Sequence, residues 1–107
     1  MNPLGFQTKA LVQGLDRCAL RHRLLAENLA NVNTPGYRAR AVEFDDFTEV
    51  ARIEERTDVD VRADGNSVSL ERETAEMEKN ALLHRVYLLG LTNGARQMRA
   101  AIDGRGS

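Results

Sequence analysis

Two long stretches of the chain place apolar residues at alternating intervals of four and three positions, and this spacing constrains the fold more than any other feature. The first stretch covers residues 4–32 and the second covers residues 70–102. Residues at this spacing lie along one side of an α-helix, as in the seam of a coiled coil. The seam residues on which the prediction depends are Leu11, Leu15, Cys18, His22, Leu25 and Leu29 in the first helix, and Met77, His84, Leu88 and Leu91 in the second.

The second helix also carries end signals. Asp64-Gly65-Asn66 is a typical turn sequence, and either Ser67 or Ser69 can cap the helix that follows. Gly104 suits the end of that helix, because glycine is the usual residue just after a helix terminus.

The segment between the helices has weaker periodicity. Phe44, Phe47 and Val50 are predicted to form a short apolar turn, and residues 59–61 alternate as a brief strand does. We therefore predict an all-α fold, in which two long terminal helices form a coiled-coil-like hairpin around a short, irregular or partly disordered middle segment. The predicted parts are residues 1–37, 38–66 and 67–107.

Length and charge exclude several classes of protein. The 107 residues, with a net charge of −1, suit one modest domain, and no basic stripe marks a nucleic-acid interface. No apolar run approaches the roughly 20 residues that cross a bilayer, and we expect no cleaved signal peptide. Residues 1–40 hold six Lys or Arg and two acids, whereas residues 41–107 hold nine and fourteen. This asymmetry favours pairing within the chain or between subunits.

A second apolar face lies outside the seam of the second helix. Leu82, Val86 and Leu89 follow one another at helical spacing, and Gly90 and Gly94 add small residues beside them. The chain offers no third helix to cover this face. We therefore predict that other subunits contact it.

The two seams suggest an antiparallel register in which large residues oppose small ones. In this hypothesis the position numbers of opposing residues add to 106, so Leu11 faces Ala95 and His22 faces His84.

Cys18, His22 and His84 are the best candidates for a zinc site. A fourth ligand is missing from their neighbourhood, and all three lie on apolar seams, so we interpret them as packing residues. The sequence also lacks a nucleophile beside a base, paired carboxylates and a phosphate-binding glycine loop. We therefore predict no enzyme activity, no cofactor and no small-molecule substrate.

The first helix ends in "ENLANVNTPGY", residues 27–37. Thr34 precedes a proline and is biased away from helical geometry. Pro35 and Gly36 suit the centre of a type II turn, in which glycine supplies the positive φ. Asn28, Asn31 and Asn33 can bond free carbonyls or a neighbouring backbone, and the ring of Tyr37 can anchor the turn.

The decapeptide "NLANVNTPGY", residues 28–37, resembles the signature of the bacterial flagellar rod, hook and hook-associated proteins. Two further stretches, "YRARAVEFDDF" and "DGNSVSLERETAEMEKNALLHRVYLL", are most similar to the proximal rod protein of the flagellar basal-body rod family. The resemblance covers nearly the whole chain, although the middle segment looks shorter than is usual in the family.

The resemblance implies a structural component of the axial drive shaft, whose terminal helices assemble in the periplasmic rod. It implies export from the cytoplasm by the flagellar type III apparatus, and association as a homo- and hetero-oligomer with other rod proteins, the rod-to-membrane-ring adaptor protein and the export gate. It also implies a role in structure and assembly for the signature residues, which are Asn28, Ala30, Asn31, Thr34, Pro35, Gly36 and Tyr37.

Two alternatives remain open at this point. The chain can be another rod paralogue, or a cytoplasmic helical-hairpin adaptor or export chaperone. An adaptor would have the same seams, and only the signature argues against it.

Overall fold

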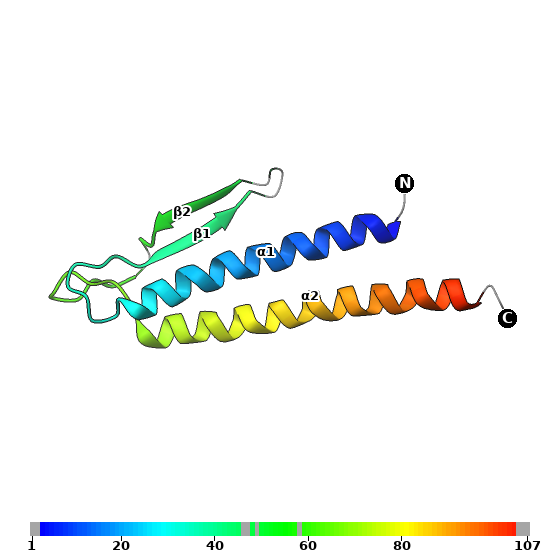
Figure 1. The fold of residues 1–107 in the computed structure, drawn as a ribbon. Coiled ribbons are helices and arrows are strands. Elements are labelled where there is room, and N and C mark those ends of the chain that lie inside the picture. Colours follow the sequence, from blue (N-terminus) through cyan, green and yellow to red (C-terminus); the bar gives the residue numbers. More distant parts are fainter. Residues whose placement is uncertain (1–2, 46–47, 49, 58, 105–107) are drawn as a thin grey trace.

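The chain folds into two long antiparallel helices with a small β-hairpin beside them (Figure 1). The computed structural model describes residues 3–45, 48, 50–57 and 59–104. The elements are α1 (Pro3–Ala30), β1 (Arg40–Phe44), β2 (Ala51–Glu55) and α2 (Leu70–Gly104). The molecule is elongated and measures 69 × 25 × 16 Å. We call the end with the loops between the helices the closed end, and the end with the two termini the open end.

The prediction of two long helices is confirmed, but the all-α class is wrong because the middle segment forms a two-stranded antiparallel sheet. The register pairs Val42 with Ile53 and Phe44 with Ala51. Residues 59–61 are not a strand, and Phe47 lies outside the described residues. Every residue of β2 is exposed, and its alternation of Ala51, Arg52, Ile53 and Glu54 is too short and too polar to have indicated a strand in the sequence.

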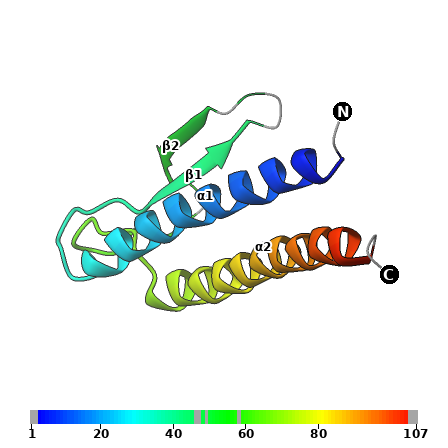
Figure 2. The ribbon, with the colours of Figure 1, turned by 45° about the vertical axis from the view of Figure 1, so that its right-hand side comes forward.

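The hairpin is held on α1 through β1, and α1 lies on the side of β1 opposite β2 (Figures 1 and 2). Phe44, which we predicted in an apolar turn, is the last residue of β1. The guanidinium carbons of Arg17 and Arg21 lie 4.9 and 5.4 Å from its ring centroid. Cations over an aromatic face attract the ring electrostatically, so these two arginines help to dock the hairpin on α1.

The helices meet in a register five positions away from the predicted one. Leu11 contacts Gly90, and the space beside Gly14 is filled by the ring of Tyr87, at 2.5 Å from where a Cβ would lie. These pairs have position numbers that add to 101, not to 106, so the predicted register is wrong. The prediction placed the mostly apolar row of each helix in the contact, with His22 and His84 as polar interruptions.

Polar and small residues occupy the contact between α1 and α2 instead. The side-chain amide of Asn80 donates to the carbonyl of Cys18 at 2.9 Å and accepts a bond from Arg21 at 3.3 Å. Asn28 of α1 donates to Glu73 of α2 at 3.1 Å. Buried polar groups are tolerated where they bond one another, and here they displace the apolar row of α2 to the flank of the contact.

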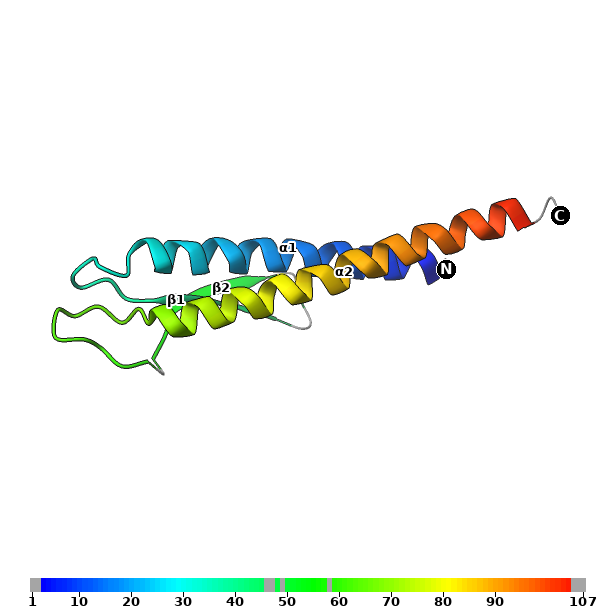
Figure 3. The ribbon, with the colours of Figure 1, turned by 90° about the horizontal axis from the view of Figure 1, so that it is seen from below.

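The buried residues gather toward the closed end. The buried apolar side chains are Cys18, Leu24, Leu25, Ala39 and Val68, and the buried polar ones are Asn28, Asn66, Ser67, Glu73 and Asn80. At the open end α2 continues past the start of α1 (Figures 1 and 3). Among the described residues, neither helix has a stretch long and apolar enough to cross a membrane.

Candidate functional site

The signature stretch forms a defined turn immediately after α1. Asn31 donates from its side chain to the carbonyl of Glu27 at 2.8 Å, and its backbone N donates to the same carbonyl at 3.2 Å, so Asn31 bonds the last turn of α1 twice. The hydroxyl of Thr34 donates to the side chain of Asn31 at 3.1 Å. Tyr37 N donates to Thr34 O at 3.2 Å, and Gly36 has a φ of 77°. The predicted type II turn is therefore confirmed.

A second turn, at residues 62–65, packs against the signature turn. Gly36 N donates to the carbonyl of Asp64 at 2.8 Å. A Cβ on Gly65 would lie 3.3 Å from the Cα of Gly36, so the two backbones pass closely, and Gly65 itself has a φ of 84°. Arg62 adds a bond from its guanidinium to the carbonyl of Val32. The two turns thus fasten the segments that precede β1 and α2.

Asn66 joins these two turns from inside. Its fully buried side chain donates to the carbonyl of Asn31 at 2.8 Å and to that of Thr34 at 2.6 Å. Its side-chain oxygen accepts a bond from Val68 N at 2.6 Å. The side-chain amide of Asn66 therefore bonds two carbonyls beyond the end of α1 and one backbone N–H before α2. From the sequence, Asn66 was predicted only as a turn residue, because its bonding partners Asn31 and Thr34 lie more than 30 positions away.

Asn28 closes the edge of β1. Its side chain donates to the carbonyl of Arg40 at 2.9 Å and accepts from Arg40 N at 3.0 Å. A carboxamide presents the same donor and acceptor as a peptide group, so Asn28 replaces one residue of a neighbouring strand. Tyr37 donates to the same oxygen at 3.4 Å. Hydrogen bonds with Tyr37 and Glu27 raise the pKa of Arg40, whose guanidinium lies 2.6 Å from the Glu27 carboxylate.

Glu73 and Arg56 form a buried ion pair that ties the end of the hairpin to α2. Arg56 Nη1 lies 3.0 Å from Glu73 Oε1, and the side chains are only 9% and 1% exposed. The other carboxylate oxygen of Glu73 accepts the bond from Asn28. The opposite charges of Arg56 and Glu73 were visible in the sequence, but nothing in the sequence brought residues 17 positions apart together.

Of the two predicted capping serines, Ser69 caps α2. Its hydroxyl accepts a bond from Arg72 N at 3.3 Å. Ser67 is buried and accepts from Ala39 N at 2.8 Å, while its own N donates to Tyr37 O at 2.9 Å. Ser67 therefore links the signature segment to the start of α2.

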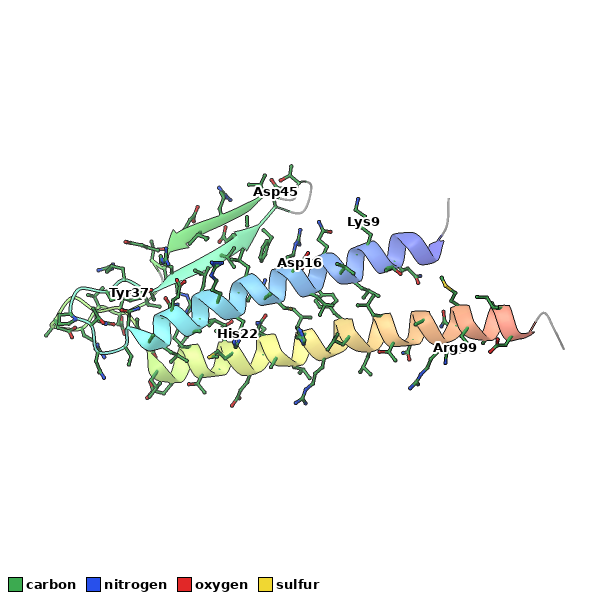
Figure 4. All side chains as sticks on the ribbon, in the orientation of Figure 1. Lys9, Asp16, His22, Tyr37, Asp45 and Arg99 are labelled. Atoms are coloured by element: carbon green, nitrogen blue, oxygen red, sulfur yellow. The ribbon has the colours of Figure 1, made fainter. Side chains whose placement is uncertain are left out.

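The structure brings only some of the signature residues into this cluster. Asn28, Asn31, Thr34 and Tyr37 contribute side chains to it, and Figure 4 places Tyr37 among the loops of the closed end. Gly36 contributes its backbone. The side chains of Ala30, Asn33 and Pro35 are exposed.

The predicted seam residues divide into three groups. Cys18 and Leu25 are buried between the helices. Half-buried positions are Leu11, Leu15, Leu29, Met77 and Leu91. His22 and His84 are exposed, and Leu88 is 43% exposed, because the contact near them is made by Arg21, Asn80 and Tyr87 instead.

Cys18, His22 and His84 line one groove between the helices. Burial raises the pKa of the Cys18 thiol, and the positive charge of Arg21 partly offsets this effect. In the described part of the chain, no three His, Cys, Asp or Glu side chains come together in a way that could hold a metal ion. The zinc alternative therefore has no geometric support among these residues.

The predicted subunit-contact face is turned away from α1. Leu82, Val86 and Leu89 are 63%, 54% and 62% exposed. Gly90, which we assigned to this face, instead makes room for Leu11 of α1. Gly94 has no neighbour within 4 Å of where a Cβ would lie, as far as the described residues show.

Comparisons with known proteins identify relatives of the chain. No family model matches it. The flagellar basal body rod protein FlgB of Aquifex aeolicus is 33% identical over 105 residues, which cover 79% of this chain and 83% of the relative. The protein of the same name from Escherichia coli is 28% identical over 126 residues, which cover 89% of this chain and 88% of the relative. Because that alignment is longer than this chain's 107 residues, the relative carries residues that this chain lacks. The chain belongs to the family of flagellar basal body rod proteins FlgB.

Proposed function

We propose that the chain is a non-enzymatic structural subunit of the flagellar basal-body rod, whose closed end is held within one chain and whose α2 completes its packing on other subunits. Membership of the family supports a place in the flagellar rod. The observation that carries the rest is the exposed row of Leu82, Val86 and Leu89 on the outer side of α2.

Burial of this row is a physical reason for assembly. Covering a leucine or valine side chain contributes about 1.5–3 kcal/mol relative to leaving it in water. The three side chains form one stripe, since they are spaced by four and three positions on a helix. Met98 and Ile102 in the final turns of α2 are exposed as well, but with about 3.6 residues per turn they lie on the opposite side of the helix from the stripe, so a second neighbouring helix would have to cover them.

Within this proposal the signature residues act indirectly. Asn28, Asn31, Thr34, Gly36 and Tyr37 fix the angle between α1, the hairpin and α2 through the bonds described above. They are therefore assembly residues because they orient the surfaces that meet other subunits. We assign residues 1–37 and 67–107 to the shaft and residues 38–66 to a surface element beside it.

The partners we propose are other rod proteins, the rod-to-membrane-ring adaptor protein and the export gate, in a homo- and hetero-oligomeric rod. We also propose that the chain reaches the periplasm through the flagellar type III apparatus without removal of an N-terminal segment. The intact mass of the protein taken from purified basal bodies tests this point, since a shortened chain would contradict it.

The function is tested by exchanging the exposed leucines. The isolated Leu82→Gln/Leu89→Gln chain should keep nearly the helical content of the native chain. In cells that lack the native protein, the same variant should abolish rod assembly and motility. Leu70→Gln is the matched control, because Leu70 is 54% exposed on the same helix at the closed end.

The control chain should support motility. Normal rods with the double variant would remove the role of this face. Normal motility in cells that lack the protein altogether would remove the rod function itself.

A further inference from the structure

The outer edge of β2 is not covered by the described part of the chain. The sheet has two strands, and β2 packs against neither helix. Figures 1 and 2 show β2 on the side of β1 that is turned away from α1. All five residues of β2 are exposed. An exposed edge of this kind is a template for pairing with another strand.

The bonds of the hairpin show which backbone groups of β2 point outward. Arg56 N donates to Ala39 O at 2.8 Å, and Asp45 N donates to Val50 O at 3.3 Å. Bonded and non-bonded pairs alternate along an antiparallel ladder. From the observed register, the inward groups belong to Arg52 and Glu54, and the outward groups belong to Ala51, Ile53 and Glu55.

The opposite edge of the sheet agrees with this assignment. Arg40 pairs with Glu55, so its N–H and C=O also point away from the ladder. Both groups bond to the side chain of Asn28. The fold therefore closes the edge of β1 at Arg40 with an amide. In the described part of the chain, no group bonds to the outward N–H and C=O of Ile53.

We propose that β2 pairs with β2 of a second copy of this chain, antiparallel and about a two-fold axis at Ile53, so that two hairpins form one four-stranded sheet. Ile53 exchanges both backbone bonds with Ile53 of the second copy. Ala51 and Glu55 exchange theirs with Glu55 and Ala51 of that copy. The β2 edges of both hairpins are thereby covered.

Charge selects this register over its neighbours. With Ile53 on the axis, Arg52 of each copy lies opposite Glu54 of the other, and opposite charges at directly facing positions are favourable. If one strand slides by two residues in either direction, the outward backbone groups still pair. Arg52 then lies opposite Arg52, or Glu54 lies opposite Glu54. Both shifts bring like charges together, so only the central register is self-complementary.

The side chains on the axis fit the same arrangement. Ile53 is 48% exposed and would contact its equivalent, which removes apolar surface on both copies. Within one chain Arg52 is only loosely paired, at 3.7 Å from Glu43 and 3.9 Å from Glu54, with all three side chains more than half exposed. Arg52 is therefore free to turn toward the second copy.

The contact is small and two-fold. Interfaces well below about 1,200 Å² are weak and transient, so the pair should depend on concentration. A two-fold contact closes on itself and cannot repeat along a shaft, so the pair describes the chain before it enters an assembly. The proposal stands apart from the rod function and can fail without affecting it.

The first experiment blocks the edge without touching the ladder inside the hairpin. Ile53→Pro removes only an outward N–H, a position that a strand edge tolerates. Ile53→Ala is the matched control, because it also loses the side chain but keeps the N–H. Sedimentation of the full chain across a concentration series should show reversible dimers for the native chain, weaker dimers for Ile53→Ala and monomers for Ile53→Pro.

The second experiment tests the register by disulfide formation in a Cys18→Ser background. Facing non-bonded residues have Cα atoms about 4.5 Å apart, which a disulfide can bridge. A mixture of Arg52→Cys and Glu54→Cys chains should cross-link under mild oxidation. Each chain alone should not.

Three results would overturn the proposal. The first is a native chain that stays monomeric at every concentration, even if it pairs with a strand of another protein. Dimers can persist in Ile53→Pro and disappear in Leu82→Gln/Leu89→Gln, which would place the contact on α2. Finally, Arg52→Cys can cross-link with itself as readily as with Glu54→Cys.

Discussion

The closed and the open end of the helix pair are stabilised in different ways. At the closed end, Asn28, Asn66 and Glu73 are almost completely buried and bond to one another or to nearby backbone groups. At the open end, every residue of α2 from Ala95 to Gly104 is exposed. Among the described residues, no buried side-chain nitrogen or oxygen lacks a hydrogen bond. Polar bonding therefore defines the fold at the closed end, while exposed apolar surface is left at the open end.

The largest effect should come from breaking the buried ion pair at the closed end. Glu73→Ala leaves the charge of Arg56 and the amide of Asn28 without their shared acceptor. Removal of one partner of a buried pair typically costs about 3–5 kcal/mol. Urea unfolding followed by circular dichroism should show this loss for Glu73→Ala. Glu78→Ala, an exposed acid on the same helix, should change the free energy of unfolding by no more than about 0.5 kcal/mol.

If both variants behave alike, the ion pair does not hold the closed end. A native-like stability of Glu73→Ala would then shift the explanation to the turns around Asn66.

Two glycines allow the same substitution to be compared inside the helix contact and outside it. A Cβ at Gly14 would lie 2.5 Å from the Tyr87 ring, whereas Gly94 has open space. Overpacking costs about 1–3 kcal/mol, while alanine in a helix interior gains about 1 kcal/mol over glycine. Gly14→Ala should therefore lower the melting temperature and Gly94→Ala should raise it. Equal shifts would contradict the observed register of the helices.

The signature turn should tolerate only residues that accept a positive φ. Gly36 has no neighbour within 4 Å of where a Cβ would lie, so Gly36→Val is opposed by backbone geometry alone, at about 1 kcal/mol or more. Gly36→Asn should lose less, since asparagine visits this region more readily. Melting curves of both variants, together with motility, measure the difference. Should valine and asparagine prove equivalent, the turn would not limit stability.

The smallest effect concerns Cys18. Burial raises the pKa of its thiol in the folded chain, so the folded state holds the proton more tightly than the unfolded state. The associated stability is present below the ordinary thiol pKa of about 8.5 and is lost as the pH rises past it. Cys18→Ser should remove this alkaline part of the pH dependence, measured by urea unfolding between neutral and alkaline pH. Rapid alkylation of Cys18 in the folded chain would indicate that the thiol is not buried.

The sequence predicted the parts of the fold that follow from local pattern. Both helices, the cap options before Leu70 and the turn at Gly36 were recognisable, since spacing and turn chemistry act over a few residues. The hairpin was not recognisable. β2 consists of Ala, Arg, Ile and two Glu and is exposed throughout, so it is a strand only because it pairs with β1.

The helix register was missed for a related reason. Two rows of residues run one position apart along α2, and the prediction followed the more apolar one. The observed contact includes Asn80, Arg21 and Asn28, which are stable there only because each finds a bonding partner far away in the chain. Such partners cannot be read from spacing. The row that holds Asn80 also holds Glu73 and Tyr87, so no apolar pattern marked it.

Hydrogen exchange tests the central claim most directly, namely that one chain holds the closed end and other subunits complete the open end. Mass spectrometry can compare amide protection in the free chain and in isolated rods for peptides covering residues 24–40, 62–80 and 82–104. We predict that the first two are protected in both states and that residues 82–104 become protected only in rods. Equal protection of residues 82–104 in the free chain, or none in rods, would contradict this account.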